Sequence, residues 1–460
     1  MLGRLLQPEI RELIAKRDFG VLREVLLDCS PVELADVITA LEQSGQAVVF
    51  RLLPREFAAD VFEYLDFPIQ EQIIRGLGQE QVAEILNEMS PDDRTAFLEE
   101  MPATAARRLL ELLTPSERAV AATLLGYPDH SIGRLMTPDY LTLKSDWNLP
   151  RILEHIRNNG EKSETLHTLY VIGTDGRLLR EISLRELLIM PPEITANDCG
   201  DDEPPVLQPQ DDRTRAVELF RKYDKTVLPV LDANNVMLGI VTVDDVLDIA
   251  EEEATEDIQK LGGLEALDEP YLTMRFAGMI RKRASWLVVL FVGEMFTATA
   301  MSYFEDEIAR AVVLALFVPL IISSGGNSGS QAATLVVRAL ALGEISMEDW
   351  WRVMRREIAA GIVLGASLGL IGFLRITAWS FLFPNTYGEH WIMLGTTIWC
   401  SLIFVVLFGT LSGSMLPILL KKLGADPAAS SAPFVATLVD VTGLVIYFSI
   451  AAVILSGYYL

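Results

Sequence analysis

The sequence predicts a multidomain membrane protein with an all-α superhelical N-terminal domain, an α/β tandem and an all-α transmembrane domain of five helices. Three observations support this. An apolar residue recurs every twelve residues in the first part of the chain, a strand–turn–strand–helix pattern occurs twice in the next part, and five long apolar stretches fill the C-terminal part. A fixed period indicates stacked repeats, and apolar stretches of about 20 residues are long enough to cross a bilayer.

Residues 1–130 are predicted to form an acidic helical solenoid. Helix-breaking or capping residues follow each member of the twelve-residue register, as is typical of short stacked helices. The register residues are Leu53, Leu65, Leu77, Met89, Met101, Leu113 and Leu125. Ser90 and Thr114 each precede a proline and are expected to begin helices. The acids that follow them, including Asp92 and Asp93, are interpreted first as helix-start residues, with cation binding left open as an alternative.

Residues 131–250 are predicted to contain two copies of one α/β module. Each copy reads as strand, turn, strand and helix, with turns at Asp175-Gly176 and at Asn234-Asn235. A proline-rich, acidic connector at residues 191–209 joins the copies. Residues 246–270 follow as an acidic connecting helix, which Gly262-Gly263 are expected to end.

Residues 284–460 are predicted to form the transmembrane domain. The expected spans are residues 285–304, 309–340, 359–383, 390–420 and 433–455. Basic residues cluster beside alternate ends of these spans, at Arg281-Lys282-Arg283, at Arg338, Arg352, Arg355 and Arg356, and at Lys421-Lys422. Loops 305–307 and 384–389 contain no Lys or Arg. Because basic loops stay in the cytosol, we expect a plasma (inner) membrane protein with a cytosolic N-terminus and an outside C-terminus.

The charge is divided sharply along the chain. Residues 1–270 hold 52 of the 63 acidic and 26 of the 38 basic residues, a net charge of −26, whereas residues 271–460 hold 11 and 12. An acidic half disfavours nucleic acid, which requires clustered Lys and Arg, and favours cations as partners, although acidity also aids solubility. Neither a phosphate-binding Gly-Lys-Ser loop nor a metal-ligand spacing of His or Cys occurs, so we expect no enzyme.

Polar residues inside the apolar stretches indicate function. Asp440 lies within the fifth span and Glu294 within the first, and a carboxylate at that depth is costly unless it faces a partner or water. Packing of Asp440 against an Arg, and a protonated Glu294 near hydroxyl groups, are the structural alternatives. Residues 323–331, which include Asn327 and Gln331, interrupt the second span with small and amide residues that allow close helix approach or line a wet cavity. Asp426 precedes the fifth span.

These patterns resemble known families. The tandem resembles a pair of CBS modules, which typically sense adenine nucleotides or metal ions, so ATP is a candidate ligand. Glu186 in the first copy stands where Asp245 stands in the second, which departs from the nucleotide-binding pattern. The domain order, with the sequences GGNSGSQAATL and DPAASSAPFVATLVDVTGL, resembles the MgtE family of magnesium channels across essentially the whole chain.

The resemblance implies a homodimer in the lipid bilayer, with the pore between the two membrane domains. Asp440 then binds the permeating ion, and Asp426 matches the family's acid at the cytosolic mouth. Ala436, one turn before Asp440, could offer its carbonyl, and Asn327 and Gln331 belong to the polar second-span motif. Few carboxylates suit Mg²⁺, which sheds water reluctantly.

The resemblance also implies a gate. In the family the connecting helix plugs the pore when cytosolic magnesium is high, because bound ions bridge acids that otherwise repel one another. The matching positions here are Asp212, Asp224, Asp245, Asp248, Glu253, Glu256 and Asp257. Arg213, Thr214 and Arg215 depart from the acids that many family members carry after the first of these.

The sequence therefore predicts a magnesium-selective channel for Mg²⁺ influx that cytosolic Mg²⁺ closes. Two alternatives remain. The first is a channel of the same architecture for another divalent cation such as Co²⁺ or Mn²⁺, although no Cys or Met lies beside Asp440. The second is a membrane-tethered sensor of magnesium or nucleotide that transports nothing.

Overall fold

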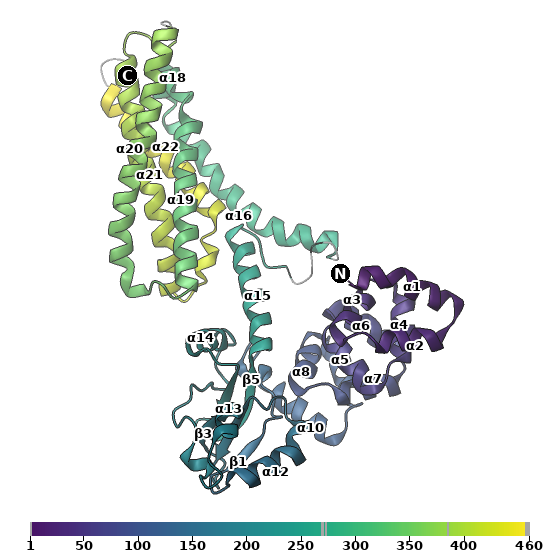
Figure 1. The fold of residues 1–460 in the computed structure, drawn as a ribbon. Coiled ribbons are helices and arrows are strands. Elements are labelled where there is room, and N and C mark those ends of the chain that lie inside the picture. Colours follow the sequence, from purple (N-terminus) through teal and green to yellow (C-terminus); the bar gives the residue numbers. More distant parts are fainter. Residues whose placement is uncertain (1, 268–270, 272–273, 384–385, 456–460) are drawn as a thin grey trace. The chain divides into compact units, whose positions relative to one another are not determined.

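The structure is a computed structural model that describes residues 2–267, 271, 274–383 and 386–455. It divides into two compact units, Met1–Glu251 and Glu252–Leu460, which are described separately below (Figure 1). The predicted ends of three regions lie outside the described residues: 268–270 of the connecting helix, 384–385 of the loop before the fourth span, and 456–460 of the transmembrane domain.

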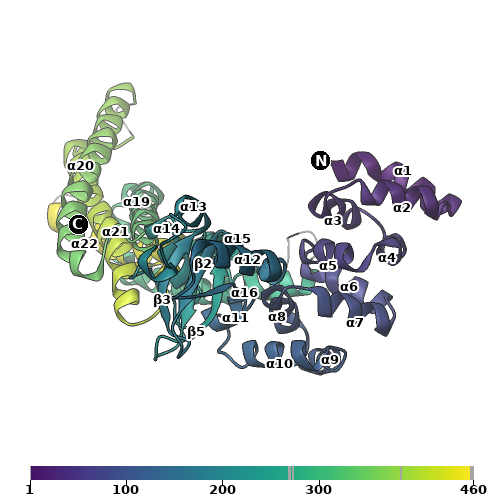
Figure 2. The ribbon, with the colours of Figure 1, turned by 60° about the horizontal axis from the view of Figure 1, so that its bottom comes forward.

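The N-terminal part of the first unit is a succession of short helices, which Figure 2 shows packed one after another. They are α1 (Leu2–Lys16), α2 (Phe19–Leu27), α3 (Pro31–Thr39), α4 (Gln43–Leu52), α5 (Arg55–Glu63), α6 (Phe67–Gly76), α7 (Gln79–Glu88), α8 (Pro91–Glu100), α9 (Ala103–Leu110) and α10 (Pro115–Leu124). The predicted helical solenoid is confirmed. Register residues Leu53, Leu77, Met89 and Met101 are the residues at which α4, α6, α7 and α8 end.

The predicted helix starts at Ser90 and Thr114 are also confirmed. The Ser90 hydroxyl accepts a hydrogen bond from the Asp93 N–H at 3.3 Å, and the Thr114 hydroxyl accepts one from the Glu117 N–H at 3.4 Å. Each satisfies a backbone donor that the first helical turn leaves unpaired.

Two α/β modules complete the first unit. The first contains α11 (Ile132–Leu135), β1 (Thr142–Lys144), α12 (Leu149–Asn159), η1 (Gly160–Lys162), β2 (Thr168–Ile172), β3 (Leu178–Ser183), α13 (Leu184–Ile189) and η2 (Ala196–Asp198). The second contains α14 (Thr214–Tyr223), β4 (Val227–Leu231) and β5 (Met237–Thr242). β2 and β3 are antiparallel, as are β4 and β5. Bridges from Thr137 to Ile240 and from Arg177 to Val236 join the copies, so the tandem is one body.

The connecting helix α15 (Val243–Leu261) continues directly from the second module. It ends before Gly262-Gly263, as predicted, with Gly263 at a φ of +73°, a conformation that favours glycine. The predicted range to residue 270 was too long, since residues 264–267 are not helical.

The second unit contains five helices long and apolar enough to cross a membrane. They are α16 (Phe276–Tyr303), α19 (Val318–Ala341, with the short α18, Val312–Ala315, before it), α20 (Trp350–Leu382, preceded by η3, Met347–Asp349), α21 (Trp391–Lys422) and α22 (Ala432–Leu455). α17 (Glu305–Arg310) and η4 (Pro427–Ala429) lie in the connections. In Figure 1 α19 to α22 run side by side, whereas no residue of α16 is buried.

Glycines bring α19 and α21 into backbone contact. A Cβ atom built on Gly409 would lie 2.3 Å from the carbonyl oxygen of Gly325, and one on Gly413 would lie 2.0 Å from that of Gly329. The two pairs form a small-residue stripe on each helix, which permits close packing in lipid. The predicted close approach is thus confirmed, and α19 is continuous through the small and polar residues 323–331.

Candidate functional site

Asp440 and Glu294 face each other from two spans. Asp440 is half-buried on α22 and Glu294 is exposed on α16. Gly293 lets the helices approach, since a Cβ there would lie 3.0 Å from Thr437 Cγ2. The two carboxyl groups interact electrostatically with each other. Two ionised carboxylates repel, so this contact requires a proton or a cation between them. Glu294 therefore has a partner that neither of its predicted readings named.

The polar residues of the second span lie on α19. Asn327 donates a hydrogen bond to the Ser323 hydroxyl at 3.4 Å, and both Asn327 and Gln331 are exposed on the unit. Ala436 lies against the other side of the same helix, with its Cβ 3.6 Å from a Cβ built on Gly326. No contact in the described part of this chain joins Asn327 or Gln331 to Asp440.

Lys260 joins the end of α15 to the start of η4. Its ammonium group lies 2.6 Å from Glu256 Oε1 and 2.6 Å from Asp426 Oδ2. The other oxygen of Asp426 accepts the Ala428 N–H at 2.8 Å. Partial burial opposes the charge on Lys260, yet its hydrogen bonds to these two carboxylates raise its pKa. Burial and Asp426 raise the pKa of neighbouring Asp257, against the effect of Lys260. The structure thus gathers Glu256, Asp257 and Asp426 around an internal cation.

The chain beyond α15 is fixed against the membrane helices. A Cβ on Gly263 would lie 2.8 Å from the Trp286 ring and 3.2 Å from Pro433. The Trp286 indole donates to the Ser431 hydroxyl at 3.2 Å, and Lys282 donates to the carbonyl of Ala266. These contacts hold the end of the connecting helix beside the beginnings of α16 and α22.

A second acidic cluster lies in the first unit, where α8 faces the start of α15. Electrostatic interactions connect its carboxyl groups, which are those of Glu63, Asp92, Asp93, Glu164, Asp244, Asp245 and Asp248. Asp92 is only 7% exposed, and its Oδ1 has no hydrogen-bond partner in the described part of the chain. Such a group destabilises the fold unless something compensates it.

Burial shifts the pKa values in this cluster upward. It raises the pKa of Glu63 to about 7, with Asp93 adding to the effect and a 3.0 Å hydrogen bond from the Ser90 N–H opposing it. Burial likewise raises the pKa of Asp245 to about 7, although the Thr242 hydroxyl donates to it at 2.7 Å. The pKa of Asp92 is also raised, by burial and then by Asp245. These groups favour a proton or a bound cation.

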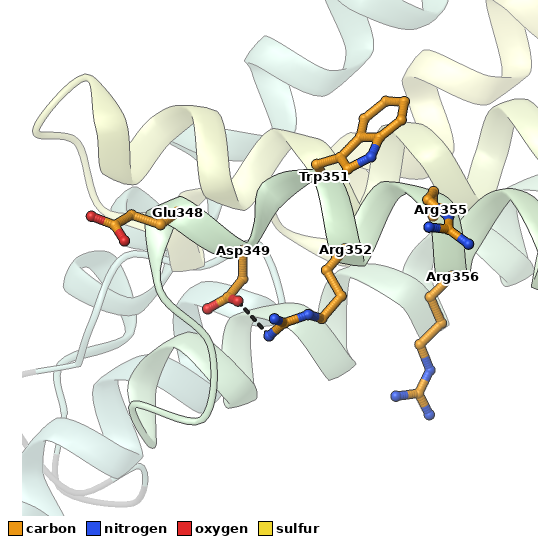
Figure 3. A pocket seen from close by; sticks show the side chains of 6 residues that line it. All are labelled: Glu348, Asp349, Trp351, Arg352, Arg355 and Arg356. Atoms are coloured by element: carbon orange, nitrogen blue, oxygen red, sulfur yellow. Dashed lines mark hydrogen bonds and ion pairs between the residues drawn. The ribbon is translucent and has the colours of Figure 1, made fainter.

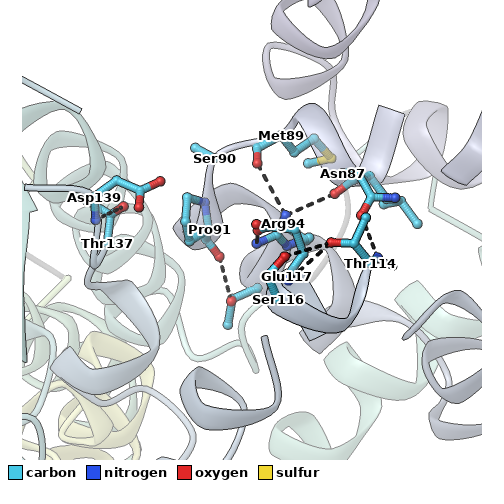
Figure 4. A network of polar contacts seen from close by, with 12 residues as sticks. Asn87, Met89, Ser90, Pro91, Arg94, Thr114, Ser116, Glu117, Thr137 and Asp139 are labelled. Atoms are coloured by element: carbon cyan, nitrogen blue, oxygen red, sulfur yellow. Dashed lines mark hydrogen bonds and ion pairs between the residues drawn. The ribbon is translucent and has the colours of Figure 1, made fainter. Parts of the chain in front are cut away.

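A buried arginine fixes the position of the acids on α8. Arg94, which is 0% exposed, donates to the carbonyl of Leu86 at 3.1 Å and pairs with Glu117 at 2.5 Å. Figure 4 shows this network, with Asp139 and Thr137 on the far side of Pro91 from Arg94. Because the Arg94 guanidinium pairs with Glu117 inside the solenoid, it does not neutralise the acidic cluster.

The other predicted regulatory residues are separate. Asp212 accepts hydrogen bonds from the Thr214 N–H at 2.9 Å and hydroxyl at 2.6 Å, which lower its pKa although burial opposes them. Asp224 ends α14 with a left-handed backbone. Glu253 is half-buried on α15. Asp212 and Asp224 lie outside both acidic clusters.

No group of three or more His, Cys, Asp or Glu side chains in the described ranges is close enough to hold a metal ion by itself. This arrangement is compatible with Mg²⁺, which usually keeps several waters and uses only one or two carboxylates. The sequence reasoning did not single out Glu63, Glu164, Asp244 or Lys260. Only Lys260 carried a local signal, as a lysine four residues after Glu256 on a helix.

The CBS-like tandem contains a cleft of about 630 Å³. His167, Arg185, Asp224 and the ion pair of Glu181 with Lys225, at 2.6 Å, lie in its lining. Glu181 is 6% exposed and its second oxygen has no partner in the described residues. The Arg185 cation fits a phosphate, whereas Lys225 already neutralises Glu181, so the cleft fits a nucleotide only in part.

Comparison with known proteins decides the family. Family models match residues 29–130 as an MgtE intracellular N domain, residues 132–191 and 197–252 as CBS domains, and residues 318–450 as MgtE, a divalent cation transporter. The magnesium transporter MgtE of Thermus thermophilus is 36% identical over 455 residues, which are 97% of this chain and 98% of that protein. This chain belongs to the MgtE family.

Other relatives agree with this assignment. The magnesium transporter MgtE of Bacillus subtilis is 29% identical and covers 95% of this MgtE-family chain. The crystal structure of the cytosolic domain of the Mg²⁺ channel MgtE in complex with ATP is 33% identical, with a TM-score of 0.51, and covers 53% of this chain and 100% of that one. The soluble part of a magnesium transporter, at 23% identity and a TM-score of 0.52, shows the same fold. The predicted family, fold class and CBS tandem are confirmed, and the chain is a multi-pass membrane protein.

Proposed function

We propose that this MgtE-family protein is a magnesium-selective channel that admits Mg²⁺ through the plasma membrane and is closed by cytosolic Mg²⁺. The observation that carries the proposal is the contact of Asp440 with Glu294 inside the membrane unit. A pair of carboxyl groups at that depth is costly, and a hydrated divalent cation between them would offset the cost.

The proposed pore is formed by two copies of the chain. α16 has no buried residue, and its exposed apolar side chains, such as Leu287, Phe291 and Phe296, are free to pack on a second copy. Among the described residues, two carboxyl groups meet at Asp440, so a second copy would supply further oxygen ligands, with the Ala436 carbonyl, Asn327 and Gln331 as further candidates along the spans.

The proposed gate uses the two acidic clusters. Mg²⁺ bound among Asp93, Asp245 and their neighbours would neutralise the acidic cluster of the first unit. Mg²⁺ bound among Glu256, Asp257 and Asp426 would hold the end of α15 against η4. We propose no catalytic role. The basic clusters Arg281–Arg283, Arg352–Arg356 and Lys421-Lys422 support a cytosolic N-terminus and an outside C-terminus.

Asp440→Asn tests the pore. We expect Mg²⁺ flux into vesicles that contain the reconstituted full chain to fall by about tenfold or more, since a neutral amide cannot replace the carboxylate charge. Glu305→Gln, which removes a charge from the short helix α17 between the first two spans, is the control and should keep native flux. Unchanged Mg²⁺ flux in Asp440→Asn would refute the pore assignment. Flux of Co²⁺ or Mn²⁺ that exceeds Mg²⁺ flux would favour the alternative ion.

We also propose that ATP binds in the tandem cleft, because the related cytosolic domain was crystallised with ATP and Arg185 supplies a cation here. Titration of the full chain with a fluorescent ATP analogue should show saturable binding that Arg185→Gln weakens by about threefold to tenfold. Arg151→Gln, on α12 outside the cleft lining, is the control. Equal affinity for all three proteins would contradict this site.

A further inference from the structure

A basic patch lies where the third span begins. Arg352, Arg355 and Arg356 follow η3 at helical spacings of three and four residues, so they share one side of the first turns of α20. Together with Glu348, Asp349 and Trp351 they line a hollow of about 580 Å³. Figure 3 shows Arg352 and Arg356 extending in the same direction from the helix.

Two of the three arginines form no ion pair in the described part of the chain, although Arg356 interacts electrostatically with Glu357. Arg352 pairs with Asp349 at 2.7 Å, and Asp349 also accepts the N–H and hydroxyl of Ser346 at 3.0 and 2.9 Å. Arg355 and Arg356 are exposed and form no ion pair with any residue that the structure describes. The lining therefore has three positive and two negative side chains, and its net positive charge is concentrated on Arg355 and Arg356.

An apolar hollow of about 890 Å³ adjoins this patch, and Glu348 lines both. Its walls come from α20, α21 and α22 and include Trp350, Phe408, Met415 and Leu438. Lys422 adds a further cation at its edge. Trp350 and Trp351 are 48% and 53% exposed, as tryptophans at a membrane–water boundary commonly are.

We propose that these adjoining hollows bind one anionic glycerophospholipid. Its phosphate is held by Arg355 and Arg356, and an acyl chain lies in the apolar hollow. Arginine pairs bind phosphate bidentately, and basic pockets between transmembrane helices are suited to anionic headgroups. A lipid matches both hollows at once, whereas a soluble anion would fill only the charged one. The arginines would recognise the negative charge of the headgroup, and the adjoining apolar hollow would recognise the acyl chain.

The test compares lipid binding by charge-matched variants. Native mass spectrometry of the full chain in detergent, titrated with phosphatidylglycerol, should show one saturable lipid that phosphatidylcholine does not displace. Arg355→Gln with Arg356→Gln should weaken this binding about 30-fold. Arg281→Gln with Arg283→Gln removes the same charge beside the first span and should leave it unchanged. Arg355→Lys with Arg356→Lys, which keeps the charge but loses the bidentate geometry, should bind with an affinity between those of the native chain and the glutamine variant.

Three outcomes would overturn the proposal. Equal loss of binding in the two glutamine variants would mean a general charge effect. Glycerol 1-phosphate that binds the native chain as tightly as the lipid does would exclude the acyl groove. A glutamine variant that alters the proportion of dimer but not lipid binding would assign the patch to a second copy of the chain.

Discussion

At the scale of residues, the candidate site depends on which charges meet. Asp440 and Glu294 form a contact of two acids, whereas Asp426 and Glu256 share the ammonium of Lys260. The first arrangement attracts a cation, and the second already contains one. A divalent ion that binds Asp426 must therefore displace Lys260 or share the carboxylates with it.

Lys260→Gln tests this internal cation. Without magnesium, loss of the ammonium leaves Glu256, Asp257 and Asp426 to repel one another, so amides of residues 252–267 should exchange about threefold to tenfold faster. Millimolar Mg²⁺ should restore protection, and Lys260→Arg should resemble the native chain. The measurement is hydrogen–deuterium exchange on the full chain. Unchanged exchange of Lys260→Gln in magnesium-free buffer would contradict the role of Lys260.

At the scale of elements, the membrane unit depends on backbone contact between helices. α19 remains helical through residues 323–331, because Gly325 and Gly329 fit against Gly409 and Gly413. A hydroxyl of α22 is also satisfied by the backbone, since Tyr447 donates to the Leu314 carbonyl at 2.9 Å. The small polar stretch therefore serves packing without breaking the span.

Gly413→Ala tests this packing. Its methyl group would meet the Gly329 carbonyl, and overpacking of this kind costs about 1–3 kcal/mol. We expect a lower midpoint of thermal unfolding in detergent for the full chain. Gly278→Ala, on α16 where nothing lies within 4 Å of a built Cβ, is the matched control and should keep the native midpoint. Equal midpoints for Gly413→Ala and the native chain would contradict the contact.

At the scale of the whole molecule, folding brings acidic side chains that are distant in the sequence close together. The first unit packs acids of the solenoid against acids of the second module, around Asp93 and Asp245. Hydrogen bonds from Ser90 and Thr242 oppose this repulsion, whereas burial adds to the cost of ionised carboxylates. Protons or cations that neutralise the cluster are therefore expected to stabilise the unit.

The pH dependence of stability follows from the raised pKa values. Glu63 and Asp245 hold protons to about pH 7 in the folded unit, but only to about 4.5 and 3.8 ordinarily. The folded state binds more protons in this window, so stability falls as pH rises through about 7. In magnesium-free buffer, α5 and α8 should therefore lose protection from pH 6 to pH 8.

Hydrogen–deuterium exchange of the full chain, corrected for the intrinsic rate, measures this loss, which we expect to be about tenfold. Glu63→Gln should reduce it, and the exposed Glu80→Gln should not. Mg²⁺ at pH 8 should restore protection. Protection that increases from pH 6 to pH 8 would show that the cluster does not bind protons as described.

The sequence by itself determined the helical solenoid, the tandem, the connecting helix and the five spans, because these follow from local periodicity, capping and apolar length. It also singled out Asp440 and Asp426 by their positions. Only the tertiary structure decided that Glu294 faces Asp440, that Lys260 lies between Glu256 and Asp426, and that Glu63 joins the cluster at α8. Glu63 and Asp93, Glu294 and Asp440, and Lys260 and Asp426 are 30, 146 and 166 positions apart, and each contact also depends on which face of a helix packs inward. No local pattern contains that information.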